Sequence, residues 1–84
     1  MFFVYILKSR RNSSLYTGSC KDIHKRLSLH NGLMVKSTKR YAPWDIVYIE
    51  SFATLREART RELKIKSWKK RAQLENLIKH FKII

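Results

Sequence analysis

The chain begins with short, dense apolar runs and continues with segments in which apolar residues recur at helical spacing. Residues 4–7 are β-branched, aromatic or aliphatic throughout, which is typical of a strand that is covered on both faces. The wholly polar residues 10–14 predict a hairpin loop. Residues 44–51 are apolar on both alternating faces, with Ile46 and Tyr48 sharing one of them, so we interpret this segment as an internal strand.

The predicted hairpin brings two tyrosines together. If its loop covers residues 9–12, Tyr5 lies directly opposite Tyr16 on one face. Gly18 then falls at the end of the second strand, where the backbone could bend or approach a ligand closely. The two phenols are either ordinary core aromatics or part of a site, and the hairpin alone leaves both interpretations open.

A first helix is expected over residues 21–31. Ser19 and Asp22 resemble a capping pair at its start, since a short polar side chain there can accept a hydrogen bond from the free amides of the first turn. Gly32 is a typical stop signal at its end.

Two further helices follow the third strand. Thr54 and Glu57 form a capping box for a helix over residues 55–68, and apolar residues at helical spacing predict a last amphipathic helix over residues 74–81. The expected order is β-β-α-β-α-α in a single domain, residues 1–84. The predicted fold is therefore α+β, a small, mostly antiparallel three-stranded sheet flanked by helices.

Polar residues interrupt the apolar stripes of two predicted helices. Glu62 lies between Ala58 and Ile65, and a carboxylate facing a core must be paired or bind a cation to offset its desolvation. A salt bridge to a nearby arginine and a functional role both satisfy that requirement. Arg26 lies at the edge of the apolar arc of the first helix, one turn before His30, where its stem could also simply cover apolar surface.

The charge balance points to a polyanionic partner. Nineteen Lys and Arg residues against six Asp and Glu give a net charge of +13, and so large an excess on a small surface repels itself. Nucleic acid is the expected partner. An anionic membrane surface is the weaker alternative, because no exposed helix has the strong amphipathic character that membrane binding requires. No interface signature for a homodimer or another protein partner is visible.

The remaining composition favours a cytoplasmic protein. Cys20 is the only cysteine, so no internal disulfide can form, which fits a reducing compartment. No apolar run approaches the roughly 20 residues that span a bilayer, and the first residues lack the basic lead-in of a signal peptide. A zinc site from Cys20, His24 and His30 is not expected, because the two histidines lie on different sides of one helix.

These segments resemble the GIY-YIG nuclease superfamily. Residues 4–6, Val-Tyr-Ile, and 15–18, Leu-Tyr-Thr-Gly, are similar to its paired signature. Residues 22–31 resemble its helix with the catalytic arginine, and residues 61–66 its helix with the glutamate. Order and spacing match over nearly the whole chain, and the likeness is to small stand-alone members similar to the N-terminal domain of excinuclease C.

The resemblance implies a metal-dependent endonuclease that hydrolyses phosphodiester bonds in DNA, with RNA or branched structures as alternatives. Tyr5 would help to deprotonate the attacking water, and Tyr16 would position that water or the phosphate. Arg26 would meet the scissile phosphate, and His30 would be an auxiliary catalytic group. Glu62 would hold a single divalent metal ion, Mg²⁺ in the first place and Mn²⁺ as the alternative.

Elementary chemistry sets conditions on these roles. A tyrosine with an ordinary pKa of about 10 is a poor base at neutral pH, so a nearby guanidinium and a metal cation are expected to favour the phenolate form of Tyr5. Mg²⁺ commonly takes one or two protein carboxylates and keeps several waters, so Glu62 alone suffices in principle. We therefore expect Tyr5, Tyr16, Arg26 and Glu62 to open onto one basic concavity.

The motif is degenerate in places. Val4 stands where the first signature has glycine, and Thr17 stands where the second has isoleucine. Asn76 projects away from its apolar stripe and is not a convincing counterpart of the family's later asparagine. A non-catalytic nucleic-acid-binding module that keeps the nuclease fold is therefore the second hypothesis. Under either hypothesis, the cations expected to contact flanking phosphates are Lys25, Lys36, Lys39, Arg40 and Lys66.

Overall fold

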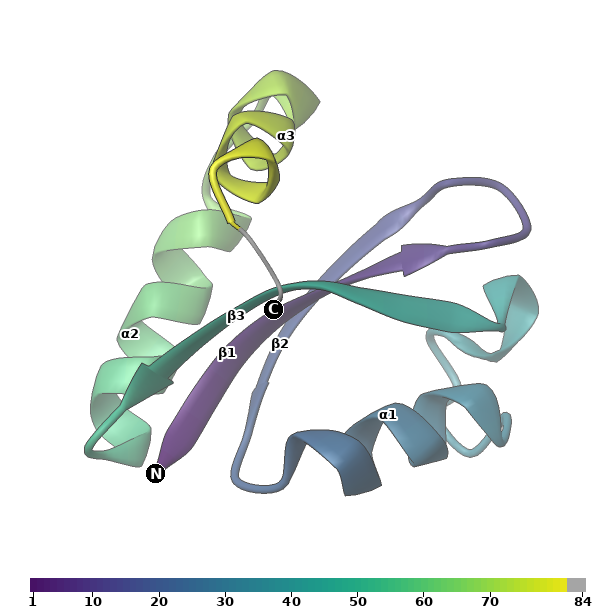
Figure 1. Ribbon diagram of the computed structural model, residues 1–84, viewed down its shortest axis with the longest axis horizontal. Helices are drawn as coiled ribbons and strands as arrows, with labels where there is room; N and C mark the ends of the chain where they lie inside the picture. The colour runs from purple at the N-terminus through teal and green to yellow at the C-terminus, as the bar shows by residue number, and fades with distance from the viewer. Residues whose placement is uncertain (82–84) are drawn as a thin grey trace.

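The computed structural model describes residues 1–81 and shows one three-stranded antiparallel sheet of order β2-β1-β3 (Figure 1). The strands are β1 (Phe2–Ser9), β2 (Leu15–Cys20) and β3 (Trp44–Phe52). The helices are α1 (Ile23–Asn31), α2 (Leu55–Lys66) and α3 (Arg71–Lys79), and a short 3₁₀ helix, η1 (Lys39–Tyr41), precedes β3. This order confirms the predicted α+β architecture. Within residues 1–81, no helix has the length and apolar character needed to cross a membrane.

β1 is the central strand, and its residues Val4 to Leu7 are all buried, as the apolar run predicts. β3 is an edge strand, so its prediction as an internal strand is wrong. Its pairing with β1 shifts register, so that Ile6 faces Tyr48 whereas Leu7 faces Ile46. Because paired residues share a face, this bulge puts Ile46 and Tyr48 on opposite faces, and not on one face as predicted.

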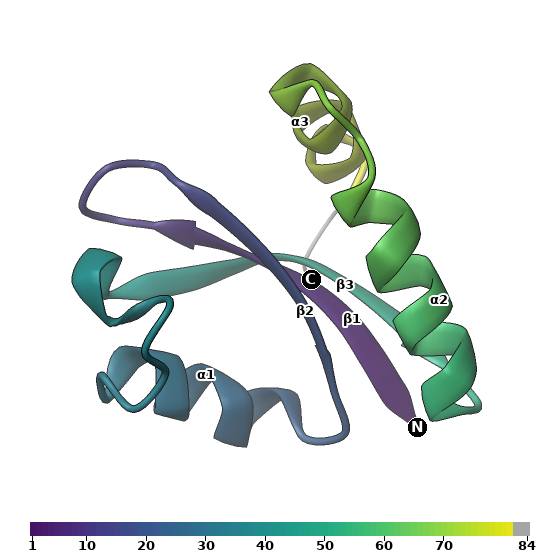
Figure 2. The ribbon, with the colours of Figure 1, turned by 180° about the vertical axis from the view of Figure 1, so that it is seen from behind.

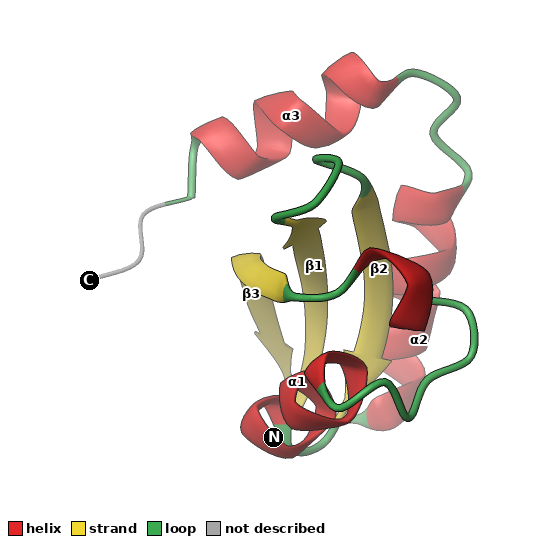
Figure 3. Ribbon diagram, turned by 90° about the vertical axis from the view of Figure 1, so that its right-hand side faces the viewer, coloured by secondary structure: helices red, strands yellow, loops and turns green. Residues whose placement is uncertain are grey.

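Helices cover the sheet on both sides (Figures 1 and 2). On one side, Val4 packs with Ala58 and Ile65 of α2, and partly buried leucines of α3 join this cluster. On the other side, Tyr5 and neighbouring apolar residues of the sheet pack against α1. Figure 3 shows α3 crossing the end of the sheet above the hairpin loop. The central strand therefore separates two small cores.

The register of the hairpin differs from the predicted one by two residues. Tyr5 pairs with Gly18, not with Tyr16. The loop does cover residues 10–14 and closes through a 2.9 Å hydrogen bond from the Ser9 amide to the Ser14 carbonyl. The Ser9 hydroxyl accepts hydrogen bonds from two loop amides, which lets the longer loop satisfy its own backbone. A shift of two residues keeps every side chain on its face, so both tyrosines still face the same side.

The ends of α1 differ from the predicted ones in detail. Asp22 alone caps the helix by accepting a 3.0 Å hydrogen bond from the Lys25 amide, and the Ser19 hydroxyl is turned towards α2 instead. At the other end, Gly32 has an ordinary φ of −82°, whereas Leu33 takes the left-handed conformation with φ 64°. The residue that ends the helix is therefore a leucine at a position that usually favours glycine.

The capping of α2 follows the prediction. The Thr54 hydroxyl accepts a 3.2 Å hydrogen bond from the Glu57 amide and donates a 3.0 Å bond to the Glu57 carboxylate. α2 ends at Lys66, before the predicted end. Leu74 and Leu77 of α3 pack on the core cluster as expected, so the last helix does lay its apolar face on the sheet.

Candidate active site

Tyr5 is the buried centre of the candidate site. Its side chain is only 1% exposed, and its hydroxyl lies 2.5 Å from the place that a Cβ on Gly18 would occupy. Gly18 therefore lies inside β2 to make room for the Tyr5 ring, and not at the strand end as predicted. The Tyr16 ring is diagonal to that of Tyr5, with 6.5 Å between the ring centroids.

His30 connects the tyrosines to the loop that follows α1. Its Nε2 is 3.1 Å from the Tyr5 hydroxyl, and its Nδ1 is 2.7 Å from the Thr38 hydroxyl. The Tyr16 ring meets the imidazole edge-on, with 5.0 Å between centroids. Thr38 is almost completely buried, and sequence reasoning did not identify it, because a threonine in a basic loop carries no signal of a buried contact.

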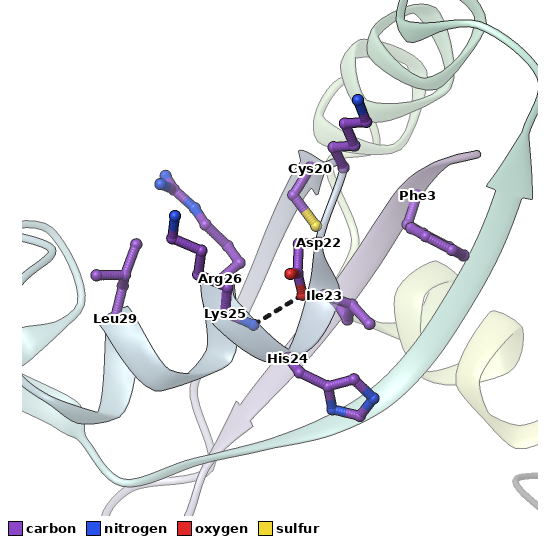
Figure 4. Close-up of a pocket in the computed structure, with 9 residues that line it drawn as sticks. Phe3, Cys20, Asp22, Ile23, His24, Lys25, Arg26 and Leu29 are labelled. Atoms are coloured by element: carbon purple, nitrogen blue, oxygen red, sulfur yellow. Dashed lines mark hydrogen bonds between the residues drawn. The ribbon is translucent and has the colours of Figure 1, made fainter.

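Arg26 lies beside Tyr5 and lines a large open hollow. Its Nε is buried and has no hydrogen-bond partner among residues 1–81. The hollow is a cleft of about 820 Å³ between β1, the end of β2 and α1, with Phe3, Cys20 and Lys25 in its lining. Figure 4 shows these side chains gathered around the start of α1. Neither tyrosine lines this cleft.

Glu62 extends from α2 to β2, the strand that carries Tyr16. One carboxylate oxygen accepts a hydrogen bond from the Ser19 hydroxyl, and the other lies 2.6 Å from the Lys66 ammonium. That ammonium lies 5.9 Å from the centroid of the Tyr16 ring. Glu62 is thus connected to Tyr16 around the edge of β2.

Arg26 and Glu62 do not share one concavity. Ser19 and Cys20 are neighbours on β2, so they point to opposite faces of the sheet. Cys20 lines the large cleft with Arg26, whereas Ser19 lines a smaller hollow of about 350 Å³ with Glu62. The expectation of a single concavity is therefore replaced by two hollows, one on each side of the β2 edge.

The electrostatics of Tyr5 differ from the expected ones. Burial raises the pKa of Tyr5 to about 12, and the polar contact with the Arg26 guanidinium, together with its positive charge, opposes this rise without overcoming it. Burial, aided by Arg26, lowers the pKa of His30 below its ordinary value. Tyr5 is therefore a neutral phenol at physiological pH, next to a neutral imidazole.

Glu62 keeps its negative charge. Partial burial raises the pKa of its carboxyl, but the Lys66 ammonium and the Ser19 hydroxyl outweigh burial, and the net pKa lies below the ordinary value. Among residues 1–81, no group of three or more His, Cys, Asp or Glu side chains comes together. Cys20 and His24 point in different directions (Figure 4). An ionised carboxylate is a suitable ligand for a divalent cation, and Glu62 is one. It already pairs with a positive group, the Lys66 ammonium.

The cations predicted to contact phosphates fall into two groups. Lys36 is exposed on the loop after α1, Lys39 and Arg40 are exposed on η1, and Lys25 is exposed on α1 itself. Lys66 differs from them because its ammonium is paired with Glu62.

Comparisons with known proteins agree with this architecture. The model of the family described as the GIY-YIG catalytic domain matches residues 1–76. A UPF0213 protein of Staphylococcus saprophyticus is 43% identical over 74 residues, which cover 87% of this chain and 89% of that protein. A UPF0213 protein of Clostridium perfringens is 41% identical over 76 residues, covering 89% and 81%. The solution NMR structure of a UPF0213 protein from Bacillus halodurans has a TM-score of 0.55 at 30% identity, covering 89% and 81% of the two chains.

Proposed function

We propose, since the chain belongs to the GIY-YIG family of catalytic domains, that it is a metal-dependent endonuclease that hydrolyses phosphodiester bonds in DNA. RNA and branched nucleic acids are the alternative substrates. The observation that carries this proposal is the buried Arg26 Nε, which has no partner among residues 1–81 and belongs to a side chain that lines an open, basic cleft.

An unpaired buried donor is expensive for a folded protein. Leaving such a group without a hydrogen bond costs about 1–3 kcal/mol, and more when the group is charged. A phosphate oxygen is the natural acceptor, because the guanidinium fork matches phosphate geometry. Arg26 would therefore bind the scissile phosphate and neutralise the charge that develops on it during hydrolysis.

The proton path follows from the contacts of Tyr5. The Thr38 hydroxyl donates to the Val35 carbonyl at 3.4 Å. Its proton is therefore used there, so we assign His30 Nδ1–H as the donor to the Thr38 oxygen. His30 Nε2 then accepts the Tyr5 O–H at 3.1 Å. As water attacks phosphorus, its proton would pass to the Tyr5 oxygen while the Tyr5 proton passes to His30. Tyr5 then needs no prior ionisation, which its high pKa makes unfavourable.

The remaining residues would orient this group. Tyr16 packs edge-on against both His30 and Trp44, so its position is fixed from two sides. It would hold the water or the phosphate against Tyr5. Glu62 would hold the divalent cation, Mg²⁺ in the first place and Mn²⁺ as the alternative. When bound, the cation would supply positive charge to the phosphate and to the leaving oxygen.

A non-catalytic nucleic-acid-binding module is the second candidate function. Two observations favour it, namely the high pKa of Tyr5 and the position of Glu62 in a hollow separate from that of Arg26. Such a module would use the same cations to bind phosphates but would have no turnover.

A cleavage assay separates the two candidates. Duplex, single-stranded and branched DNA, and matching RNA, are incubated with the protein and Mg²⁺, Mn²⁺ or EDTA. The endonuclease requires metal-dependent cleavage that Arg26→Ala and Glu62→Ala each reduce at least about 100-fold, the scale of losing one charge-stabilising group. Lys79→Ala and Glu75→Ala remove the same charges from α3, where both side chains are exposed, and should cleave normally. Cleavage that survives both site variants would identify a contaminant, and binding without cleavage would favour the module.

A further inference from the structure

The Lys66 ammonium contacts Glu62, the carboxylate that we propose would hold the divalent cation. The ammonium is 2.6 Å from one carboxylate oxygen, while the Ser19 hydroxyl donates to the other. Both oxygens of Glu62 are therefore engaged. A divalent cation on the same carboxylate would be repelled by the ammonium at short range, so the bound Lys66 ammonium opposes metal binding at Glu62.

The Lys66–Glu62 ion pair is less exposed to water and more firmly oriented than an ordinary pair on a helix surface. Exposed pairs one turn apart contribute little, because water screens them and both long side chains are mobile. Here the Glu62 side chain is only 16% exposed, and Ser19 fixes its orientation. The ammonium also lies over the Tyr16 ring, 5.9 Å from its centroid, which favours a cation at the same point.

Lys66 also keeps freedom to move away. Its side chain is 46% exposed, three times the exposed fraction of Glu62. A flexible four-carbon stem with a strongly hydrated charge at its end can swing into solvent or to a phosphate without a change in the backbone. The ion pair therefore fixes the orientation of the Glu62 carboxylate, and it can break when the Lys66 side chain moves away.

We propose that Lys66 competes with the divalent cation for Glu62, so that metal binding is weakened for as long as its ammonium stays on the carboxylate. This inference rests on the proposed function, which places the metal at Glu62. Lys66 is a residue that sets the metal requirement and does not touch the reacting atoms. Its departure from Glu62 would also release it to pair with a phosphate oxygen next to Tyr16.

The test measures Mn²⁺ binding directly. Mn²⁺ is titrated into the wild-type protein and its variants, and binding is followed by calorimetry and by paramagnetic broadening of the backbone NMR signals around Glu62. Lys66→Met removes the competing charge and should tighten Mn²⁺ binding about 5- to 10-fold, the effect of displacing one partly buried ion pair. Lys66→Arg keeps the ion pair and should bind Mn²⁺ within about twofold of the wild type.

Lys64→Met is the matched control. Lys64 is an exposed cation on the same helix, so its removal makes the same change in net charge without opening Glu62. The metal concentration that gives half-maximal cleavage should fall in Lys66→Met by the same factor as the dissociation constant. Circular dichroism confirms that each variant is folded before titration.

The outcomes separate this proposal from the proposed function. If Mn²⁺ broadens the signals around Glu62 in the wild type but Lys66→Met binds it no more tightly, the competition is overturned and the metal site stands. Equal tightening in Lys64→Met and Lys66→Met would reduce the effect to net charge and would also overturn it. If Mn²⁺ does not reach Glu62 in any variant and cleavage needs no metal, both proposals fail.

Discussion

Tyr5 and Gly18 show how one residue type dictates another across a strand pair. The Tyr5 ring lies over the backbone of Gly18, and any side chain there would meet the ring at 2.5–3.2 Å. The sequence identified both residues but assigned them other neighbours, because the register of a hairpin depends on how its loop satisfies its own backbone. Here the Ser9 hydroxyl satisfies the loop backbone by accepting hydrogen bonds from two loop amides. A serine at the end of a strand does not indicate this role in the sequence.

His30 makes stability depend on pH in a defined direction. Burial lowers its pKa in the folded protein, whereas the unfolded chain has the ordinary value of about 6.5. Below pH 6.5 the unfolded state therefore binds a proton that the folded state resists, so stability is full above pH 6.5 and is lost as pH falls below it. The loss from one group approaches at most about 1.4 kcal/mol per pH unit.

Urea unfolding at pH 8, 7, 6 and 5 measures this effect. The wild-type protein should lose stability between pH 7 and 5, and His30→Gln, less stable at pH 8, should lose much less over that interval. Asp45 and Glu62 do not account for such a loss, because their pKa values are lowered from values already below 5. Parallel curves for the two proteins would contradict the assignment to His30.

At the scale of elements, the end of α1 carries conformational strain. Leu33 has a φ of 64°, a conformation that costs a residue with a side chain about 1–2 kcal/mol and glycine little. Its side chain is 56% exposed, so truncation loses little apolar burial. Leu33→Gly should therefore raise the free energy of unfolding by about 1 kcal/mol in urea or thermal unfolding.

Lys36→Gly serves as the control for this change. Lys36 is exposed in the same loop and, unlike Leu33, does not have a positive φ. Glycine there adds freedom to the unfolded chain without relieving strain, so it should be neutral or destabilising. A Leu33→Gly variant that is less stable than the wild type would show that Leu33 makes contacts which outweigh the strain.

Element identity was predictable from sequence to the extent that local chemistry determines it. The apolar run of β1 and the Thr54 capping box needed no knowledge of distant residues, and both predictions were confirmed. The edge position of β3 and the choice of Asp22 over Ser19 as the cap were not predictable in this way. The edge position follows from the pairing of all three strands in the sheet, and the cap depends on Glu62, which is remote in sequence and takes the Ser19 hydroxyl.

The same distinction applies to the candidate site. Tyr5, Tyr16, Arg26 and His30 were grouped by their resemblance to a known motif, and the fold brings the other three next to Tyr5. The hydrogen bond between His30 and Thr38 joins a helix to a loop, and no pattern in the sequence marks it. The roles of these residues stay predictions until cleavage is measured.

At the scale of the whole molecule, the net charge of +13 makes binding to nucleic acid depend on salt under either proposed function. Each phosphate contact releases a counterion, so the logarithm of the binding constant falls with the logarithm of salt concentration by about 0.9 per contact on a duplex. The exposed Lys36 and Lys39 lie on either side of Thr38, which is hydrogen-bonded to His30. The double variant Lys36→Ala/Lys39→Ala should therefore make this slope shallower by about 1.5 to 2.

A matched variant decides whether the site face or the total charge is responsible. Lys8→Ala/Lys79→Ala removes the same charge from two exposed positions that line a hollow beside α3, on the opposite side of the sheet from α1. Fluorescence anisotropy with a labelled duplex at several salt concentrations gives both slopes. The slope of this second variant should stay close to that of the wild type, because these lysines contact no phosphate when the duplex lies along the α1 face. Equal slopes for the two double variants would mean that nucleic acid does not dock on the face that holds Tyr5 and Arg26.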